Sequence, residues 1–185
     1  MLCFYPYNQE RDKINMFNIF GKKKESIEQK IAKILFDNSM IISTAESCTG
    51  GLLSSRLTDV SGSSLYTKLN FVTYSNEVKH SLLGVTTETL EKFGAVSKEC
   101  AAEMAVGLHE RTNADVVICT TGIAGPTGGS PNKPVGLVYV AIKSKYKAVV
   151  QEFRINPKLN RKKMKYKFTQ VALEMLYDFL SDISA

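Results

Sequence analysis

The feature that most constrains the fold of this chain is an alternation of helix-like and strand-like segments, with a polar or glycine-rich loop after each early strand. Apolar residues recur at helical spacing from Glu25 to Phe36, and the β-branched run from Met40 to Thr44 predicts a buried strand. Leu69 to Tyr74 and Asp115 to Thr120 have the same strand-like character. Helices that alternate with strands in this way predict a sheet covered by helices on both faces.

The second half of the chain adds two strands and two long helices. Gly136 to Lys143 and Ala148 to Phe153 predict an antiparallel pair at one side of the sheet, because a short polar turn joins them. A helix is expected after the N-cap residue Ser97, and a final helix from about Leu159 to Leu180. We therefore predict an α/β protein, a three-layer α/β/α sandwich with a mixed, mostly parallel five-stranded sheet.

Length and composition are those of a globular protein with one substantial core, since 44% of the 185 residues are hydrophobic and 23% are charged. We expect residues 1–21 to be a poorly ordered extension, with Met16 as an alternative start, and residues 22–185 to form a single domain. No apolar stretch approaches the roughly 18 residues that a membrane helix needs, and the start of the chain lacks a leader pattern. We expect a cytoplasmic protein without a membrane partner.

The four cysteines do not indicate a metal site or a disulfide framework. Cys3, Cys48, Cys100 and Cys119 are scattered, without Cys-x-x-Cys spacing and with only two histidines in the chain. We expect free thiols and no bound metal.

Ser47 closes the first predicted strand and precedes two glycines at the start of a helix. A hydroxyl in that position is suited to nucleophilic attack, because the glycines admit a ligand close to the chain and the following amides can stabilise negative charge. The alternative is an N-cap serine with no chemical role. Cys48 is a rival nucleophile, since a thiol at a helix N-terminus can have a lowered pKa.

Lys79 and Tyr74 follow the second predicted strand and offer the base that a serine nucleophile needs. A buried lysine with a lowered pKa can accept the hydroxyl proton, as in Ser-Lys variants of serine catalysis, and a tyrosine beside it can relay protons. The alternatives are a solvated lysine and a tyrosine that packs on the core.

A glycine-rich loop, Thr121 to Pro131, follows the third predicted strand. Loops of this kind at the carboxyl ends of strands bind nucleotides in open α/β sheets, although a flexible connector is the alternative. The loop lacks the Gly-Lys-Ser/Thr ending of a P-loop, which argues against an NTPase. If the three strands are parallel, Ser47, Lys79 and this loop meet at one edge of the sheet.

Six ordered runs between residues 39 and 155 resemble the CinA C-terminal family, the nicotinamide-nucleotide amidohydrolases. These runs are Thr44-Ala45-Glu46-Ser47-Cys48-Thr49-Gly50-Gly51, Phe71-Val72-Thr73-Tyr74-Ser75-Asn76-Glu77 with Lys79, Leu83-Gly84-Val85, Gly94-Ala95-Val96-Ser97, Thr121-Gly122-Ile123-Ala124-Gly125-Pro126 with Gly128-Gly129, and Lys133-Pro134-Val135-Gly136. The resemblance implies a three-layer α/β/α fold and a homo-oligomer.

The same resemblance implies a hydrolase that removes ammonia from nicotinamide mononucleotide, a small-molecule nucleotide, to give nicotinate mononucleotide without a metal or cofactor. Ser47 then matches the nucleophile, Lys79 the base and Tyr74 the proton-handling residue. We expect Glu46 and Asn76 to orient the site or hold the ribose, and backbone amides near Cys48, Thr49 and Gly50 or in the glycine-rich loop to stabilise the oxyanion. The remaining expected substrate contacts are Thr49, Thr121, Gly122 and Lys133. Glu46 has the alternative role of capping a neighbouring amide.

Two clusters of basic residues contribute to the net charge of +6, namely residues 22–24 and residues 161–167. They are consistent with a solvated face, with a substrate phosphate contact or with nucleic-acid binding, which we consider unlikely because no recognition signature accompanies them. Here the family's usual final arginine pattern is displaced, so Arg161 or Lys165 is expected to replace it.

The sequence leaves a second function open, a non-catalytic nucleotide-binding or competence-associated module of the same family. The chain also lacks the large N-terminal domain of full-length CinA proteins, so we expect no pyrophosphatase activity linked to that domain.

Overall fold

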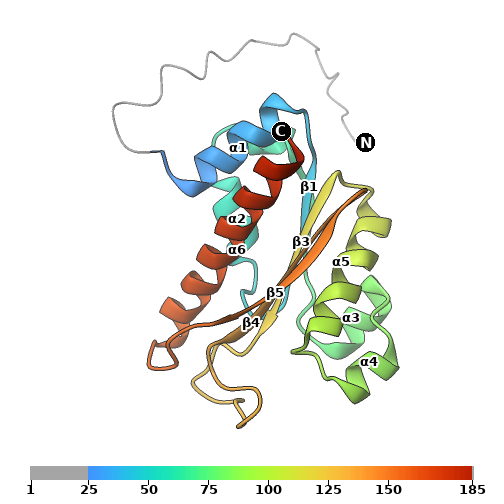
Figure 1. Cartoon of the computed structure of the whole chain (residues 1–185), viewed down its shortest axis with the longest axis vertical. Coiled ribbons are helices and arrows are strands. Elements are labelled where there is room, and N and C mark those ends of the chain that lie inside the picture. The colour runs from blue at the N-terminus through green and yellow to red at the C-terminus, as the bar shows by residue number, and fades with distance from the viewer. Residues whose placement is uncertain (1–24, 185) are drawn as a thin grey trace, which may run out of the picture.

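A computed structural model of the chain describes residues 25–184, which form helices and strands in the predicted alternation (Figure 1). The helices are α1 (Ile27–Asp37), α2 (Leu52–Thr58), the short 3-10 helix η2 (Ser63–Leu65), α3 (Asn76–Leu83), α4 (Thr87–Lys92), α5 (Lys98–Thr112) and α6 (Arg161–Ile183). The strands are β1 (Ile42–Glu46), β2 (Thr67–Val72), β3 (Val116–Gly122), β4 (Leu137–Ser144) and β5 (Ala148–Arg154).

The five strands form one mixed sheet in the order β2-β1-β3-β4-β5. β1 pairs with β2 and β3 in parallel, whereas β4 is antiparallel to both β3 and β5. Parallel neighbours require a crossover connection, which α2 supplies between β1 and β2, and α3 to α5 supply between β2 and β3. The carboxyl ends of β1, β2 and β3 therefore lie at one edge of the sheet.

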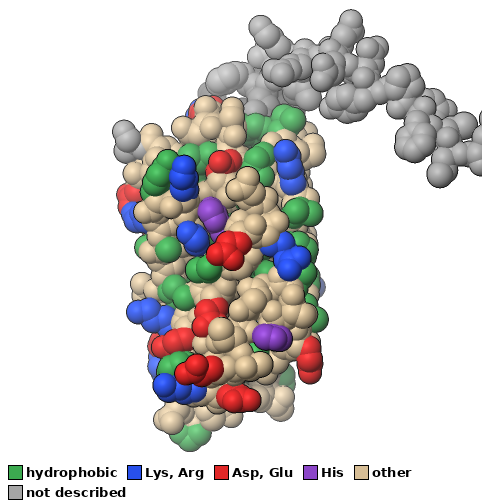
Figure 2. Space-filling model, turned by 90° about the vertical axis from the view of Figure 1, so that its right-hand side faces the viewer, with side chains coloured by type: hydrophobic (Ala, Val, Ile, Leu, Met, Phe, Trp, Pro, Cys, Tyr) green, Lys and Arg blue, Asp and Glu red, His purple; other side chains and the backbone are tan. Residues whose placement is uncertain are grey.

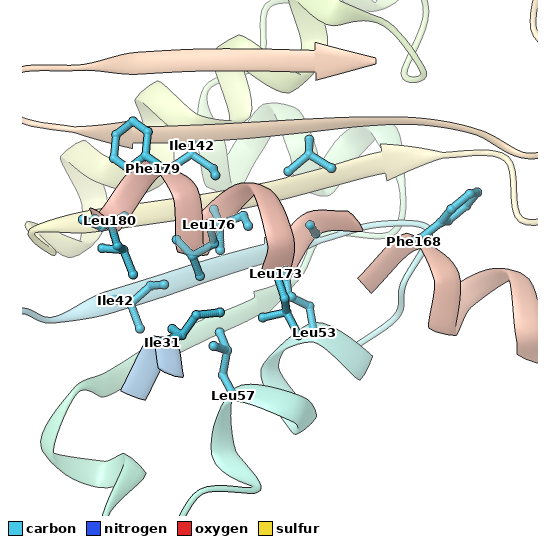
Figure 3. Packing of buried hydrophobic residues seen from close by; sticks show 14 of the residues in the cluster. Ile31, Ile42, Leu53, Leu57, Ile142, Phe168, Leu173, Leu176, Phe179 and Leu180 are labelled. Carbon is cyan, nitrogen blue, oxygen red and sulfur yellow. The ribbon is translucent and has the colours of Figure 1, made fainter. Parts of the chain in front are cut away.

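Helices cover both faces of the sheet and each face has its own core. On one face α1, α2 and α6 bury residues such as Ile31, Leu53 and Leu176 against the sheet (Figure 3). On the other face α5 packs across the strands with Met104 and Leu108, and α3 packs on α5. Truncating a buried leucine of this kind to alanine typically costs about 2–5 kcal/mol.

The neighbouring interior strands β1 and β3 are the most enclosed strands of the sheet. Every residue of β1 is buried, and so are the first six residues of β3. The edge strands β2 and β5 alternate between exposed and partly buried residues. A residue that directly follows β1 or β3 is consequently held by a rigid support.

The outer surface of the α3–α5 layer is an ordinary solvated face. Acidic and basic side chains are interspersed there, with hydrophobic side chains scattered among them (Figure 2). Within residues 25–184 no helix combines the length and apolar character needed to cross a bilayer.

The predicted three-layer sandwich and mixed five-stranded sheet are confirmed, and so is the antiparallel pair at one side. β1 extends to Glu46, two residues beyond the predicted end of that strand, and β2 begins at Thr67, two residues before the predicted start. The predictions for residues 1–21, Met16, Cys3 and the basic cluster at residues 22–24 lie outside the described residues.

Candidate active site

Ser47 is held at the end of β1 by the neighbouring strand. Its backbone N–H donates to the carbonyl of Thr120 in β3 at 3.0 Å, so the ladder continues one residue past the strand. The chain then turns through Gly50 and Gly51, whose φ angles are +60° and +89°, a region that favours glycine. This turn leads directly into α2 and leaves the Ser47 hydroxyl facing a cleft.

Glu46, immediately before Ser47, caps the start of α2. Its carboxylate is fully buried and accepts hydrogen bonds from the amides of Gly51 (2.9 Å), Leu53 (3.0 Å) and Ser54 (2.7 Å). The Ser54 hydroxyl also donates to it. These bonds satisfy amides at the helix start that have no partner within the helix. Glu46 therefore takes the capping role, which was the alternative expected from the sequence. It does not line the cleft.

Lys79 reaches Ser47 from the first turn of α3. Ser75 caps this helix by accepting a hydrogen bond from the Val78 amide, and this places Lys79 on the buried side with only 1% of its surface exposed. The side-chain nitrogen of Lys79, Nζ, lies 3.1 Å from Ser47 Oγ. It also donates to the backbone carbonyls of Thr73 (3.0 Å) and Tyr74 (3.3 Å).

Burial lowers the pKa of Lys79 below its usual value. The nearby thiols of Cys100 and Cys48 would oppose this shift as thiolates. However, burial raises the pKa of Cys100 to about 11 and that of Cys48 to about 12, so both thiols are neutral at pH 7. All three atoms that contact Lys79 Nζ are uncharged oxygens, which favours a neutral amine next to Ser47.

Cys48 borders the cleft beside Ser47 but is a poor nucleophile. Its side chain is 6% exposed, and its raised pKa leaves very little thiolate at neutral pH. The expectation that a helix N-terminus lowers this pKa is wrong here, because desolvation by burial is the largest influence on the Cys48 thiol and raises its pKa. Ser47 is therefore the better-activated group.

A cleft of about 270 Å³ opens where the three loops meet. Its lining comes from the turn after β1, from Tyr74, from the glycine-rich loop after β3 and from the first residue of α6. The lining residues are Ser47, Cys48, Tyr74, Gly122, Ile123, Ala124, Gly125, Thr127, Gly128 and Arg161. The predicted convergence of Ser47, Tyr74 and the glycine-rich loop is therefore present in the structure.

Gly122 and Gly125 allow the glycine-rich loop to fold tightly behind the cleft. A Cβ atom at Gly122 would lie 2.5 Å from the Leu137 carbonyl oxygen, and one at Gly125 would lie 2.5 Å from the Val135 side chain. A larger residue at either position would push the loop away from its support. These glycines therefore shape the cleft through packing.

Several predicted substrate contacts prove to be contacts within the protein. The Thr49 and Thr120 hydroxyls form a buried hydrogen bond of 2.8 Å, and Thr121 donates to the Ala95 carbonyl at 2.6 Å. Lys133 donates to the Phe93 carbonyl, so it fastens the glycine-rich loop to the end of α4.

Asn76 and Gly50 lie close to the cleft without lining it. Asn76 is exposed at the first position of α3, one turn before Lys79. At Gly50, an added Cβ would lie 3.1 Å from Lys165 Nζ, so the lysine crosses directly over the turn that follows Ser47.

The basic residues at the start of α6 are divided between two faces of the helix. Arg161 and Lys165, four residues apart, lie toward the cleft and the Gly50 turn. Lys162, Lys163 and Lys167 line a surface hollow with Tyr166, and Arg161 borders this hollow as well as the cleft. Figure 1 shows that α6 begins at the end of the molecule where α3 and α4 also lie.

Sequence reasoning missed the carbonyl of Thr73 and the residues from Ile123 to Gly128 as individual cleft residues. A backbone carbonyl has no residue-type signal, and the loop could be predicted only as a whole. Within the described residues, no group of three or more His, Cys, Asp and Glu side chains is arranged to hold a metal ion.

Comparison with known proteins places this site in a family. The family model described as the CinA C-terminal domain matches residues 24–180. This chain belongs to the CinA C-terminal domain family. A CinA-like protein of Chlorobium limicola is 44% identical over 168 residues, which are 89% of this chain and 39% of that relative.

Solved structures of CinA proteins have the same fold. The competence/damage inducible protein CihA from Agrobacterium tumefaciens has a TM-score of 0.79 at 42% identity, covering 88% of this chain and 99% of that chain. A CinA superfamily protein from Klebsiella pneumoniae has a TM-score of 0.80 at 30% identity, covering 84% and 96%. The chain spans about two fifths of the length of its curated relatives, for example 39% of the relative in Halothermothrix orenii.

Proposed function

We propose that this CinA C-terminal domain is an amidohydrolase that converts nicotinamide mononucleotide and water into nicotinate mononucleotide and ammonia. One observation carries the proposal: Lys79 Nζ lies 3.1 Å from Ser47 Oγ, buried and contacted only by neutral oxygens. A neutral lysine at hydrogen-bond distance from a serine at a strand end is the arrangement that Ser-Lys catalysis requires.

In the first half-reaction Ser47 Oγ attacks the carboxamide carbon while Lys79 takes the hydroxyl proton. The carbon–nitrogen bond of the resulting tetrahedral intermediate then breaks, and the nitrogen leaves as ammonia after receiving the proton from Lys79 by way of Tyr74. The product of this step is an ester between Ser47 and the nicotinate carbonyl. Lys79 is neutral again and ready for the second step.

In the second half-reaction a water molecule attacks the ester carbon and gives one proton to Lys79. The ester bond to Ser47 breaks and Oγ regains a proton from Lys79. Nicotinate mononucleotide forms as the carboxylic acid, which releases the remaining proton of the water to solvent and becomes a carboxylate. Both steps form an oxyanion, for which the amides of Cys48, Thr49 and Gly50 are suited, because they donate to no atom among residues 25–184. Losing one such donor typically costs about 3 kcal/mol.

The cations near the cleft support an anionic substrate. Arg161 lines the cleft, Lys165 lies over the Gly50 turn, and neither forms an ion pair with a carboxylate among the described residues. A substrate phosphate is the complementary charge, since guanidinium groups bind phosphate through paired hydrogen bonds.

The decisive experiment is an ammonia-release assay with nicotinamide mononucleotide, run beside free nicotinamide and glutamine. Ser47→Ala should lose turnover by about 10³-fold or more with an unchanged fold, because it removes the group that forms the ester. Cys48→Ala should keep measurable turnover, since its backbone amide remains. Turnover that survives in Ser47→Ala but is lost in Cys48→Ala would assign the chemistry to the thiol instead.

A non-catalytic nucleotide-binding module is the second candidate, favoured by the same cleft and by the cations at the start of α6. Calorimetric titration with nicotinamide mononucleotide separates the two functions. A binding module should bind without releasing ammonia, and Lys79→Ala should then keep the affinity for the nucleotide with no catalysis to lose. We further propose that the protein is cytoplasmic and forms a homo-oligomer. Light scattering of the purified chain can test the oligomeric state.

A further inference from the structure

The guanidinium of Arg161 spans the mouth of the cleft. Its Nη1 donates to the Gly125 carbonyl at 2.8 Å and its Nη2 donates to the Tyr74 hydroxyl at 2.9 Å. Gly125 belongs to the glycine-rich loop after β3, and Tyr74 follows β2. One side chain from α6 therefore joins two walls of the cleft that Ser47 also lines.

Both partners of Arg161 are neutral, although an arginine pairs best with an anion. By contrast, Arg56 and Arg154 each contact a glutamate carboxylate. Arg161 is exposed and forms no such pair among residues 25–184, so little holds it against a competing anion. A phosphate dianion offers it two charged oxygens in place of a carbonyl and a phenol.

The hydrogen bond from Arg161 also occupies the group that the proposed reaction needs. A hydroxyl that relays a proton must accept one as it gives one away. While Arg161 donates to the Tyr74 hydroxyl, it occupies an acceptor position of that oxygen. This arrangement therefore ties the two walls of the cleft together and limits Tyr74 at the same time.

We propose that Arg161 is a latch that the phosphate of the substrate opens, so that phosphate binding frees Tyr74 and admits the amide to Ser47. This inference rests on the proposed function and deepens it, because it makes the phosphate a requirement for turnover and not only an anchor. Phosphate binding then raises kcat as well as lowering KM. The substrate class is restricted to amides that carry a phosphate at the distance of the mononucleotide.

The test divides the substrate into two pieces, the nucleoside nicotinamide riboside and phosphite dianion. The wild-type protein should release ammonia from the riboside slowly, and saturating phosphite should raise this rate at least tenfold. Arg161→Met should turn over the riboside at least as fast as the wild type, show no activation by phosphite and lose turnover of the mononucleotide. Lys167→Met, an exposed lysine of α6 away from the cleft, should keep the phosphite activation.

A second readout does not depend on activity. Inorganic phosphate should change the ultraviolet difference spectrum of the wild-type protein as Arg161 leaves the Tyr74 hydroxyl, and neither Arg161→Met nor Tyr74→Phe should show this change. Absence of the spectral change together with absence of phosphite activation would overturn the latch. If mononucleotide turnover fails while the spectral change is present, the proposed reaction is wrong and the latch stands.

Discussion

Two buried basic residues on opposite sides of the sheet have different roles. Arg56 in α2 is 5% exposed and Lys79 in α3 is 1% exposed. Arg56 lies 2.6 Å from the Glu28 carboxylate, donates to Thr169 and Gln170 and stacks on the Tyr166 ring.

Lys79 has no carboxylate partner among the described residues, only the Ser47 hydroxyl and two carbonyls. A buried charge that is paired and hydrogen-bonded remains charged and ties elements together, as Arg56 does for α1, α2 and α6. A buried amine without a counter-charge is instead driven toward its neutral form. Burial therefore favours the neutral, basic form of a lysine where no carboxylate accompanies it, whereas a buried arginine with a carboxylate partner is a structural residue.

The largest expected effect comes from removing the amine of Lys79. Lys79→Met should lower ammonia release from nicotinamide mononucleotide by about 10²–10⁴-fold, the usual contribution of a general base. The fold should persist, because methionine fills the same apolar path without a buried amine. The measurement is kcat beside circular dichroism of the variant.

Lys68→Met is the matched control for this prediction, since Lys68 is an exposed lysine of β2. Its turnover should equal that of the wild type. If Lys79→Met kept full activity, Lys79 would not be the base, and the two buried cations would not differ in catalytic role.

Replacing Arg56 should lower the stability of the fold and leave turnover largely unchanged. Arg56→Met leaves the partly buried Glu28 carboxylate without its partner and should lower the free energy of unfolding by about 1.5–3 kcal/mol. Urea unfolding measures this loss, and turnover per folded molecule should change little. Lys33→Met, which breaks the exposed Lys33–Asp37 pair, should lower stability much less, because solvent screens this pair. Equal costs for the two variants would contradict the structural role of Arg56.

The smallest effect is the contribution of Lys79 to the dependence of stability on pH. Its pKa is lower in the folded protein than in the unfolded chain, because burial disfavours the charged amine. Between these two values the unfolded chain binds the extra proton, so the free energy of unfolding rises with pH, by at most about 1.4 kcal/mol per pH unit. Below the folded-state pKa the slope disappears, and turnover should fall there as well because the base is protonated.

Urea unfolding of the wild type and Lys79→Met between pH 7 and pH 10 isolates this contribution. Cys48 and Cys100 have raised pKa values, so above their ordinary value of 9.0 they lower stability as pH rises, in both proteins alike. The difference between the two proteins should increase in favour of the wild type as pH rises. Identical slopes would show that the amine at residue 79 is as basic in the folded state as in the unfolded chain.

The order of helices and strands, and the position of Ser47 at a strand end, could be predicted from the sequence alone. These features are local, because they follow from β-branched runs, apolar spacing and glycines close to each residue. The family motif also carried the pairing of Ser47 with Lys79, which lie 32 residues apart along the chain. The hairpin of β4 and β5 could be predicted because a short turn permits little else.

The roles of the polar residues around Ser47 depend on tertiary packing and could not be predicted from the sequence. Glu46 caps α2, Lys133 holds a loop, and Arg161 and Lys165 separate from the other cations of α6. Each of these side chains has a chemistry that fits several partners, and the choice depends on which backbone amide or carbonyl packing brings within reach. The same holds for Lys79, whose low pKa arises from enclosure by the sheet and neighbouring helices and not from its position in the chain.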